Sequence, residues 1–300
     1  MLDPRKKTVV GIGELLWDCF GELRRPGGAP ANVAFHVSQL GLNGMICSRV
    51  GSDTLGDALL QHLRGQGLEI QYIQRDTEHP TGTVTVETTR VDQPSYRIHE
   101  NVAWDHLEFD GRLSDLLENA SAICFGTLAQ RSPQSRSTVL RALDATRSAL
   151  RVYDVNLRPP YYTQQTIEAS LQLADVVKLN SGEVALVASM LGLDPDDAQG
   201  LSDTLRMSYG VELVCITRGQ HGCLTISEEE QVDVPGRQVN VVDTVGAGDS
   251  FTAALVYGLL NGWPLERIVH VANEIGALVA SRTGAMPVLR EEFAALLSTR

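Results

Sequence analysis

Short runs of apolar, often β-branched residues alternate along this chain with longer stretches of helical periodicity. Parallel strands need a crossover of about a dozen residues or more between them, which such helices supply. The alternation therefore predicts an α/β fold, with a mostly parallel sheet covered by helices on both faces. The expected strands are residues 8–13, 45–50, 122–125, 152–155, 176–179 and 213–216, and the expected helices are 29–40, 55–63, 133–150 and 167–173. We expect one domain over residues 1–300, because no linker composition divides the chain.

One region interrupts the alternation of strands and helices. Residues 83–89 alternate polar and apolar side chains, a turn follows at 91–94, and the chain returns through 95–98. A period of two predicts strands with one covered and one exposed face. Because a two-stranded ribbon is weak alone, it should pack over something. It is either a lid over a cleft or a hairpin that covers a sheet edge, and the pattern does not separate the two.

The composition is that of a globular protein, with 43% hydrophobic and 21% charged residues. The formal net charge of −12 argues against a broad surface for nucleic acid or for an anionic membrane. No apolar run reaches the roughly 18 residues of a membrane span, and residues 1–7 lack a signal-peptide core. The five cysteines are scattered, which is typical of reduced thiols. We therefore expect a cytoplasmic protein.

The segment 241–251 contains the strongest chemical signal in the chain. Gly246, Ala247 and Gly248 precede a helical pattern, and such small residues leave main-chain N–H groups open at a helix start. Those groups and the helix dipole favour an anion such as phosphate. Asp249 would repel that phosphate, which makes sense if it accepts a proton from an attacking hydroxyl. The alternative is an aspartate that only caps the helix.

A second glycine-rich element lies at residues 26–34. Gly27 and Gly28 allow a ligand to approach the main chain closely, and Asn32 offers donors and an acceptor for hydroxyls. The alternative is a loop that enters a helix, with Pro30 in its first turn. The P-loop, the dinucleotide fingerprint and the protein-kinase motifs are missing, and no His or Cys spacing suits zinc.

The two glycine-rich segments together resemble the paired signatures of the ribokinase-like (pfkB) carbohydrate kinases. Residues 27–34 with Gly41 and Gly51 are similar to the N-terminal signature, and residues 243–249 to the C-terminal one. The resemblance spans nearly the whole chain. It implies a three-layer α/β/α core with a small β-strand lid, here formed mainly by about residues 14–27 and 81–107. It also implies ATP and Mg²⁺ as cofactors, a sugar as partner and a homodimer formed through the lid.

The resemblance also implies roles for single residues. Asp249 matches the general base, and Gly246, Ala247 and Gly248 match the anion hole. The positions that match sugar contacts are Asp18, Gly27, Gly28 and Asn32. Asp18 ends a buried strand pattern, which is where open α/β sheets bind ligands. Arg97 and Arg158 would bind a neutral sugar through hydroxyls or a sugar acid through an ion pair, although Arg97 is equally well a structural cation.

Other positions match the nucleotide and metal sites of that family. Lys178, Asn180 and Glu183 resemble an Asn-x-x-Glu element in which the glutamate acts indirectly on Mg²⁺, although such a pair is also a common helix cap. Thr217, Gly219 and Gly222 resemble its nucleotide loop, and Asn273 lies where the family often contacts adenine. Carbonyl groups of residues 281–285, with Asp243, are candidates for a monovalent cation such as K⁺.

The substrate is expected to be fructose, phosphorylated at its 6-hydroxyl. Residues 13–18 look most like the fructokinase branch, while the Asp-x-Asn-x-Arg stretch at 154–158 is similar to fructokinases and to 2-keto-3-deoxygluconate kinases alike. A kinase for that acid or for another sugar or nucleoside is the nearest alternative, and a non-catalytic sugar-binding regulator is the alternative of another class. The segment between Asp18 and Gly27 is short, which predicts reduced lid strands there, and Trp104 either stacks on the sugar or fills the lid.

Overall fold

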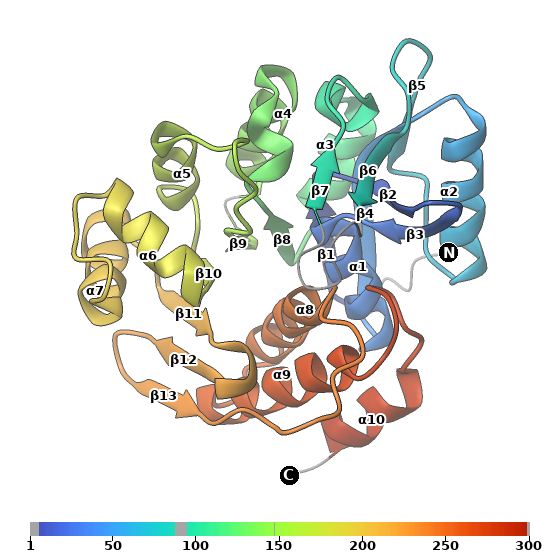
Figure 1. The fold of residues 1–300 in the computed structure, drawn as a ribbon. Coiled ribbons are helices and arrows are strands. Elements are labelled where there is room, and N and C mark those ends of the chain that lie inside the picture. The colour runs from blue at the N-terminus through green and yellow to red at the C-terminus, as the bar shows by residue number, and fades with distance from the viewer. Residues whose placement is uncertain (1–5, 88–94, 147, 299–300) are drawn as a thin grey trace.

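The computed structural model describes residues 6–87, 95–146 and 148–298, and these residues form a large and a small sheet (Figure 1). Within them the large sheet has the order β13-β12-β11-β10-β9-β8-β1-β4-β5. Neighbouring strands from β11 to β5 are parallel, and β12 and β13 add an antiparallel edge. The strands are β1 (Thr8–Ile12), β4 (Asn43–Gly51), β5 (Ile73–Asp76), β8 (Ala122–Phe125), β9 (Leu150–Asp154), β10 (Val176–Asn180), β11 (Leu213–Thr217), β12 (Cys223–Ile226) and β13 (Gln231–Val234).

Helices cover both faces of the large sheet, which confirms the predicted three-layer α/β/α core (Figure 1). One face carries α3 (Gly111–Glu118), α4 (Pro133–Ala145), α5 (Gln164–Leu171), α6 (Ser181–Met190) and α7 (Ala198–Tyr209). The other carries α1 (Ala29–Gln39), α2 (Thr54–Gly65), α8 (Ala247–Leu260), α9 (Leu265–Ala280) and α10 (Arg290–Ser298). Strand β1 shows why: Val9 enters the core beneath α8 and α9, while Val10 and Ile12 enter the core beneath α3 to α7. A central strand with apolar side chains on both faces needs both layers.

The small sheet has the order β3-β2-β6-β7, and we call it the lid sheet. Its strands are β2 (Leu16–Phe20), β3 (Leu23–Gly27), β6 (Gly82–Glu87) and β7 (Ser95–Ile98). The ribbon expected at 83–98 therefore pairs with a hairpin from the first lid segment, while the turn expected at 91–94 lies outside the described residues. Despite the short segment after Asp18, β2 and β3 pair over five residues each.

The register of the lid sheet places its side chains on two faces. Asp18 pairs with Arg25 on one side and with Val84 on the other, and Val84 pairs with Ile98, so these four share a face. Leu16, Phe20, Val84, Val86 and Ile98 form an apolar cluster on that face. Arg97 pairs with Thr85, which pairs with Cys19, so Arg97 lies on the opposite face.

Beyond the lid strands, which are not reduced, two sequence expectations about elements are wrong. The helix expected at 133–150 ends at Ala145, because Leu150 instead pairs with Ala122 at the start of β9. Asp18 does not follow a buried strand of the main sheet, since it lies in the middle of β2. In both cases main-chain pairing with a distant segment decides the structure, and local periodicity does not contain that information.

All five cysteines are free thiols, and Cys47, Cys124, Cys215 and Cys223 are buried. In the part of the chain that the structure describes, no helix is long and apolar enough to cross a membrane.

Candidate active site

Polar side chains gather where neighbouring parallel strands of the large sheet end. Glu14 follows β1, Asp154 ends β9, Asn180 ends β10 and Thr217 ends β11. The carboxyl ends of parallel strands share one edge, and open α/β sheets bind their ligands there. Thr252 of α8 donates a hydrogen bond of 2.8 Å to Oδ2 of Asp154, so the first turns of α8 lie at this edge as well.

The start of α8 has the geometry of an anion site. Gly246 caps the helix with a φ of 82°, and a Cβ at this position would lie 2.6 Å from the Cα of Ala285. Only glycine suits that conformation and that contact. Ala247 and Gly248 follow in the first turn, where N–H groups lack partners within the helix and the dipole favours negative charge.

A buried ammonium group lies directly behind this anion site. A Cβ placed on Gly248 would lie 2.9 Å from Nζ of Lys178, which is 6% exposed. Nζ donates to both carboxylate oxygens of Asp154, at 3.1 and 3.2 Å. Burial lowers the pKa of Lys178, but the carboxylates of Asp154, Glu183 and Asp249 outweigh burial, so its pKa is raised and the cation persists. The structure thus places Lys178, which the resemblance assigns to the nucleotide and metal site, next to the start of α8.

Asp249 is half-buried in the first turn of α8, next to the anion site. Its Oδ2 accepts a hydrogen bond of 2.7 Å from Nδ2 of Asn32. Burial, helped by the carboxylate of Asp154, raises the pKa of Asp249 to about 6, while the bond from Asn32 and the charges of Lys178 and Arg158 lower it. A carboxylate with this pKa is ionised at neutral pH and still basic enough to accept a proton.

The glycines of the second segment shape the same place. A Cβ on Gly27 would lie 2.6 Å from Oδ2 of Asp18, so the main chain passes close to that carboxylate. Gly28 has a φ of 115°, and a Cβ there would lie 2.3 Å from the carbonyl oxygen of Glu14. Gly28 is also the N-cap of α1, whose first turn carries Asn32. The two glycine-rich segments therefore meet at the start of α1 and α8.

The charge of Arg158 acts on three carboxyl groups of the site. Its charge lowers the pKa of Glu14, Asp18 and Asp249 against the larger effect of burial. Burial nevertheless raises the pKa of Asp18 to about 6 and that of Glu14 to about 7. Glu14 is 3% exposed, and the sequence analysis assigned it no role. The sequence held one signal that could have pointed to Glu14. It is a charged residue just after a buried strand, within an otherwise apolar run.

Asp243 connects the lid sheet to the anion site. Its Oδ2 accepts hydrogen bonds of 2.9 Å from Nη1 of Arg25 in β3 and of 3.0 Å from the N–H of Gly284. Its Oδ1 accepts from the N–H of Val245, two residues along the chain. The carboxylate therefore supports the loop 281–285 expected to offer carbonyl groups to a cation, and Arg25 is a further residue that the sequence analysis missed.

The expected nucleotide residues lie at the ends of β10 and β11 and beyond. Asn180 and Glu183 form a reciprocal capping box at the start of α6, and the second oxygen of Glu183 accepts from the N–H of Leu157. Burial raises the pKa of Glu183.

Thr217 ends β11, and a short 3₁₀ turn begins at Gly219 and is capped by Gly222. Asn273 on α9 donates from Nδ2 to the carbonyl of Pro235, and that carbonyl carbon would lie 2.6 Å from a Cβ on Gly222. No group of three or more His, Cys, Asp or Glu side chains among the described residues is placed to hold a metal ion.

Arg97 is not brought to the carboxylates, and Trp104 is enclosed by protein. Arg97 is exposed on the lid face opposite to Asp18. Trp104 is 1% exposed, with the guanidinium of Arg131 4.0 Å from its ring, and a Cβ on Gly82 would lie 2.4 Å from its Nε1. Trp104 therefore fills the space beneath the lid sheet, which is the second of its two predicted roles.

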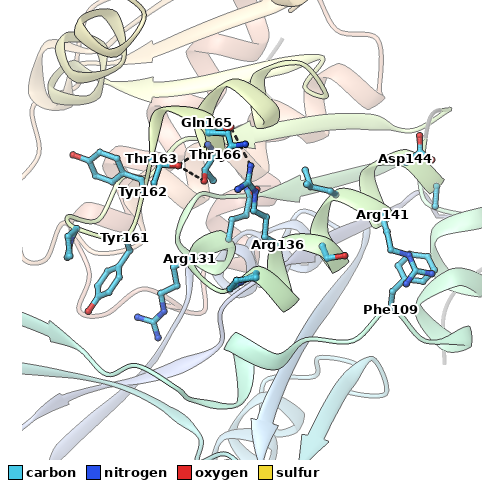
Figure 2. A pocket seen from close by; sticks show the side chains of 16 residues that line it. Phe109, Arg131, Arg136, Arg141, Asp144, Tyr161, Tyr162, Thr163, Gln165 and Thr166 are labelled. Atoms are coloured by element: carbon cyan, nitrogen blue, oxygen red, sulfur yellow. Dashed lines mark hydrogen bonds between the residues drawn. The ribbon is translucent and has the colours of Figure 1, made fainter.

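A groove of about 910 Å³ between α4 and α5 lies apart from these carboxylates. Figure 2 shows its arginines, and each is engaged within the protein. Arg131 pairs with Asp105, Arg136 donates to the carbonyl of Gln165, and Arg141 stacks on Phe109. None of the residues predicted for the site lines the groove, so we place the candidate active site at the starts of α1 and α8.

Comparison with known proteins decides the family. The model of the pfkB family carbohydrate kinases matches residues 13–292, which include both glycine-rich segments. The chain belongs to this family. It is a carbohydrate kinase with the ribokinase-like fold, as the resemblance of its signatures implies.

Relatives match over nearly their full length. An uncharacterized sugar kinase from Pyrococcus horikoshii is 34% identical, with 95% of this chain and 93% of that protein covered. Its crystal structure superposes with a TM-score of 0.83 over 96% of this chain and 97% of that one. The fructokinase of Salmonella typhimurium is 32% identical over 95% of this chain and 96% of its own length. Both relatives are named as sugar kinases, which agrees with the pfkB family and with carbohydrate kinase activity.

Proposed function

We propose that this pfkB kinase transfers the γ-phosphoryl group of ATP to the 6-hydroxyl of fructose. The observation that carries the proposal is the position of Asp249. Its carboxylate lies in the first turn of α8 beside residues 246–248, and it accepts a hydrogen bond from Asn32 of the other glycine-rich segment. A carboxylate beside a phosphate-binding helix start is explained if it acts on the hydroxyl that attacks the phosphorus.

In this mechanism Asp249 is the general base. Its carboxylate takes the proton of the sugar hydroxyl, and the hydroxyl oxygen forms a bond to the γ-phosphorus. The bond between that phosphorus and the β–γ bridging oxygen breaks, which leaves sugar phosphate and ADP. The pKa of about 6 keeps most of Asp249 ionised at pH 7, so the base is ready for the proton.

The anion site stabilises the charge on the transferring group. The N–H groups of Ala247 and Gly248 are fixed in the first turn of α8, where that of Ala247 also makes a long bond of 3.3 Å to the carbonyl of Thr244, and Nζ of Lys178 lies behind Gly248. Because these donors are held in place before reaction, they stabilise developing charge without reorganisation. Asp154 accepts hydrogen bonds from the ammonium, and Thr252 in turn donates to Asp154, so both act as positioning residues.

ATP fits the site through its phosphates. The sugar kinase of P. horikoshii has also been solved in complex with ATP, and we propose the same nucleotide here, near Thr217, Gly219 and Gly222 at the end of β11. Mg²⁺, when bound, neutralises phosphate charge, and this ion prefers phosphate and water ligands with one or two carboxylates. Glu183 is buried, and both of its oxygens accept main-chain hydrogen bonds, which suits an indirect role at the metal.

We extend the proposal to K⁺ at the loop 281–285. A fructokinase from Vibrio cholerae that is 26% identical to this chain was solved with fructose, ADP and potassium ion. Here Asp243 braces the loop through the N–H of Gly284. Replacing K⁺ by Na⁺ in the assay should lower turnover, and equal rates would count against the cation.

Fructose is favoured over a sugar acid by the carboxyl groups around Arg158. Arg158 acts on Glu14, Asp18 and Asp249, while Arg25 also acts on Asp18 and Lys178 on Asp249, so a substrate carboxylate there would have three carboxyl groups as neighbours. The Salmonella fructokinase at 32% identity agrees with a neutral ketohexose. The alternatives remain a 2-keto-3-deoxygluconate kinase or another sugar or nucleoside kinase of this family.

A substrate panel tests the proposal. The values of kcat/KM for fructose, ribose, 2-keto-3-deoxygluconate and adenosine should be compared with ATP and Mg²⁺ at pH 7.5 or so, with the phosphorylated carbon identified by NMR. We expect fructose to give the largest value and fructose 6-phosphate as product. A larger value for any other substrate would overturn the choice of sugar, and sugar binding without turnover would favour the regulator.

We also propose a homodimer formed through the lid sheet. Leu23 and Tyr96 are 54% and 57% exposed, and the register places both on the face that carries Asp18. Large apolar side chains on an outer edge suit a partner surface. Sedimentation should give a dimer that Leu23→Glu together with Tyr96→Glu converts to a monomer, and a wild-type monomer would contradict the proposal.

A further inference from the structure

Two buried oxygen atoms at the start of α1 lack a hydrogen-bond donor among the residues that the structure describes. They are Oε2 of Glu14 and Oδ1 of Asn32, in residues that are 3% and 4% exposed. Roughly 90% or more of buried polar groups in proteins have a partner, because an unpaired one has lost its water without replacement. Unpaired acceptors at the edge of a sugar site therefore indicate donors that arrive with the ligand.

The position of Asn32 shows which ligand that is. Its Nδ2 donates to Asp249, the proposed base, which leaves Oδ1 available to a donor on the substrate. Glu14 lies at the same helix start, since its Oε1 accepts from the N–H of Ala29 and its carbonyl oxygen would touch a Cβ on Gly28. Both unpaired oxygens thus belong to side chains at the start of α1, the helix that carries the partner of the proposed base.

The charged groups near Glu14 are Asp249 of α8 and Arg158 of the loop after β9. Burial raises the pKa of Glu14 to about 7, against its own N–H group, the N–H of Ala29 and the charge of Arg158, which lower it, while Asp249 raises it further. The first turn of α1 has no acidic residue, and its N–H of Ala29 donates to Oε1 of Glu14. Near neutral pH a substantial fraction of Glu14 is therefore negatively charged.

We propose that Glu14 determines the substrate class, because its free carboxylate oxygen accepts a hydrogen bond from a hydroxyl of a neutral sugar and repels the carboxylate of a sugar acid. The inference rests on the proposed sugar kinase function and deepens it. Hydroxyl groups can donate to Oε2, whereas a sugar-acid carboxylate has no proton to donate at neutral pH. Its charge would also lie near Glu14 in a low-dielectric site, where repulsion is strong.

The competing explanation is that Glu14 only caps α1. The bond from the N–H of Ala29 to Oε1 is 3.3 Å long, which is weak for a charged acceptor and leaves Oε2 unexplained. A cap would affect stability, but it would not discriminate between neutral and acidic substrates.

The variant Glu14→Gln tests the inference, because it removes the charge and keeps the shape. We expect KM for fructose to rise about tenfold or more with a smaller change in kcat, as for loss of a hydrogen bond to a charged acceptor. The ratio of kcat/KM for 2-keto-3-deoxygluconate to that for fructose should rise by about tenfold or more. Thermal shifts with each sugar in the absence of ATP give a second readout of binding.

Asp175→Asn is the matched control. Asp175 is a half-buried carboxylate that pairs with Arg151 before β10, at the opposite edge of the sheet, so its variant should leave the substrate ratio unchanged. If Glu14→Gln lowers stability but leaves the ratio and both thermal shifts at wild-type values, Glu14 is a cap and the inference is wrong. If the wild type phosphorylates none of these sugars, the proposed function fails, and the thermal shifts still decide whether Glu14 discriminates acid from neutral sugar. Absence of any sugar-induced shift in the wild type would overturn both.

Discussion

Asn32 donates a hydrogen bond of 2.7 Å to Oδ2 of Asp249, although 217 positions separate the two residues in the chain. The bond joins the first turn of α1 to the first turn of α8, and so joins the two glycine-rich segments into one site. It also stabilises the ionised form of Asp249, against burial and the nearby carboxylate of Asp154. A residue of the proposed sugar-binding segment therefore orients the proposed base and lowers its pKa.

The pKa of Asp249 predicts the pH dependence of the reaction. Burial raises this pKa from its ordinary value to about 6, and only the ionised carboxylate can accept a proton. Thus kcat/KM should fall by at least about tenfold per pH unit well below pH 6, and more steeply where Asp18 and Glu14, with pKa values of about 6 and about 7, are protonated as well. A pH–rate profile between about pH 4.5 and 8.5 measures this dependence of kcat/KM on pH.

The variant Asn32→Ala serves as the internal check on that profile. Loss of the hydrogen bond to the carboxylate removes a contribution that lowers the pKa, so the acid limb should move to higher pH. A profile that stays level down to pH 4.5 or so in the wild type would contradict the role of Asp249.

Lys178 is predicted to matter for both catalysis and stability. Lys178→Met removes the ammonium behind Gly248, and loss of one preorganised donor typically lowers kcat by about 10²–10³-fold. It also leaves Asp154 buried without its cation, which costs about 3–5 kcal/mol in comparable pairs. Initial rates and urea denaturation measure the two effects.

The double variant Lys178→Met with Asp154→Leu separates these effects. Removal of both charges should restore much of the stability, because no buried charge is left unpaired, while the low kcat persists. A Lys178→Met enzyme with kcat within threefold or so of wild type would show that the ammonium does not act on the phosphoryl group.

Arg25 is predicted to hold the lid sheet to the core. Arg25→Ala breaks the ion pair with Asp243, in which the two side chains are 31% and 17% exposed, so the effect on global stability should be small, within about 1 kcal/mol. We expect KM for the sugar to rise several-fold, because closure of the lid over the substrate loses a contact. Steady-state kinetics measure this.

Arg24→Ala is the matched control for Arg25. Arg24 is its neighbour in β3, is exposed, and pairs in register with Cys19 on the opposite face of the lid sheet. The same loss of charge there should leave KM for the sugar near the wild-type value. Equal effects of the two variants would mean that the bond to Asp243 is not what holds the lid.

The sequence predicted the parts of this protein that depend on local pattern. Buried strands such as β1 and β8 appear as short apolar runs, and α8 follows a glycine-rich start, because these features follow from backbone and burial preferences of neighbouring residues. The resemblance to pfkB kinases then placed Asp249 and Asn32 in one site, and the structure brings them together.

The sequence failed where distant segments decide the outcome. The face on which Arg97 lies depends on how β7 pairs with β6, and a shift of one residue would reverse it. The end of α4 depends on the pairing of Leu150 with Ala122. Glu14 and Arg25 owe much of their importance to groups distant in the chain, Arg158 and Asp249 for Glu14 and Asp243 for Arg25.

The most direct test of the account is the rate of phosphoryl transfer by Asp249→Asn. Asparagine keeps the shape and can still contact Asn32, but it cannot accept the proton of the sugar hydroxyl. With the best substrate of the panel, kcat should fall by about 10²–10⁴-fold, while thermal shifts with sugar and with ATP remain close to those of the wild type. Turnover that stays within about tenfold of the wild type, with binding intact, would contradict the assignment of Asp249 as the base.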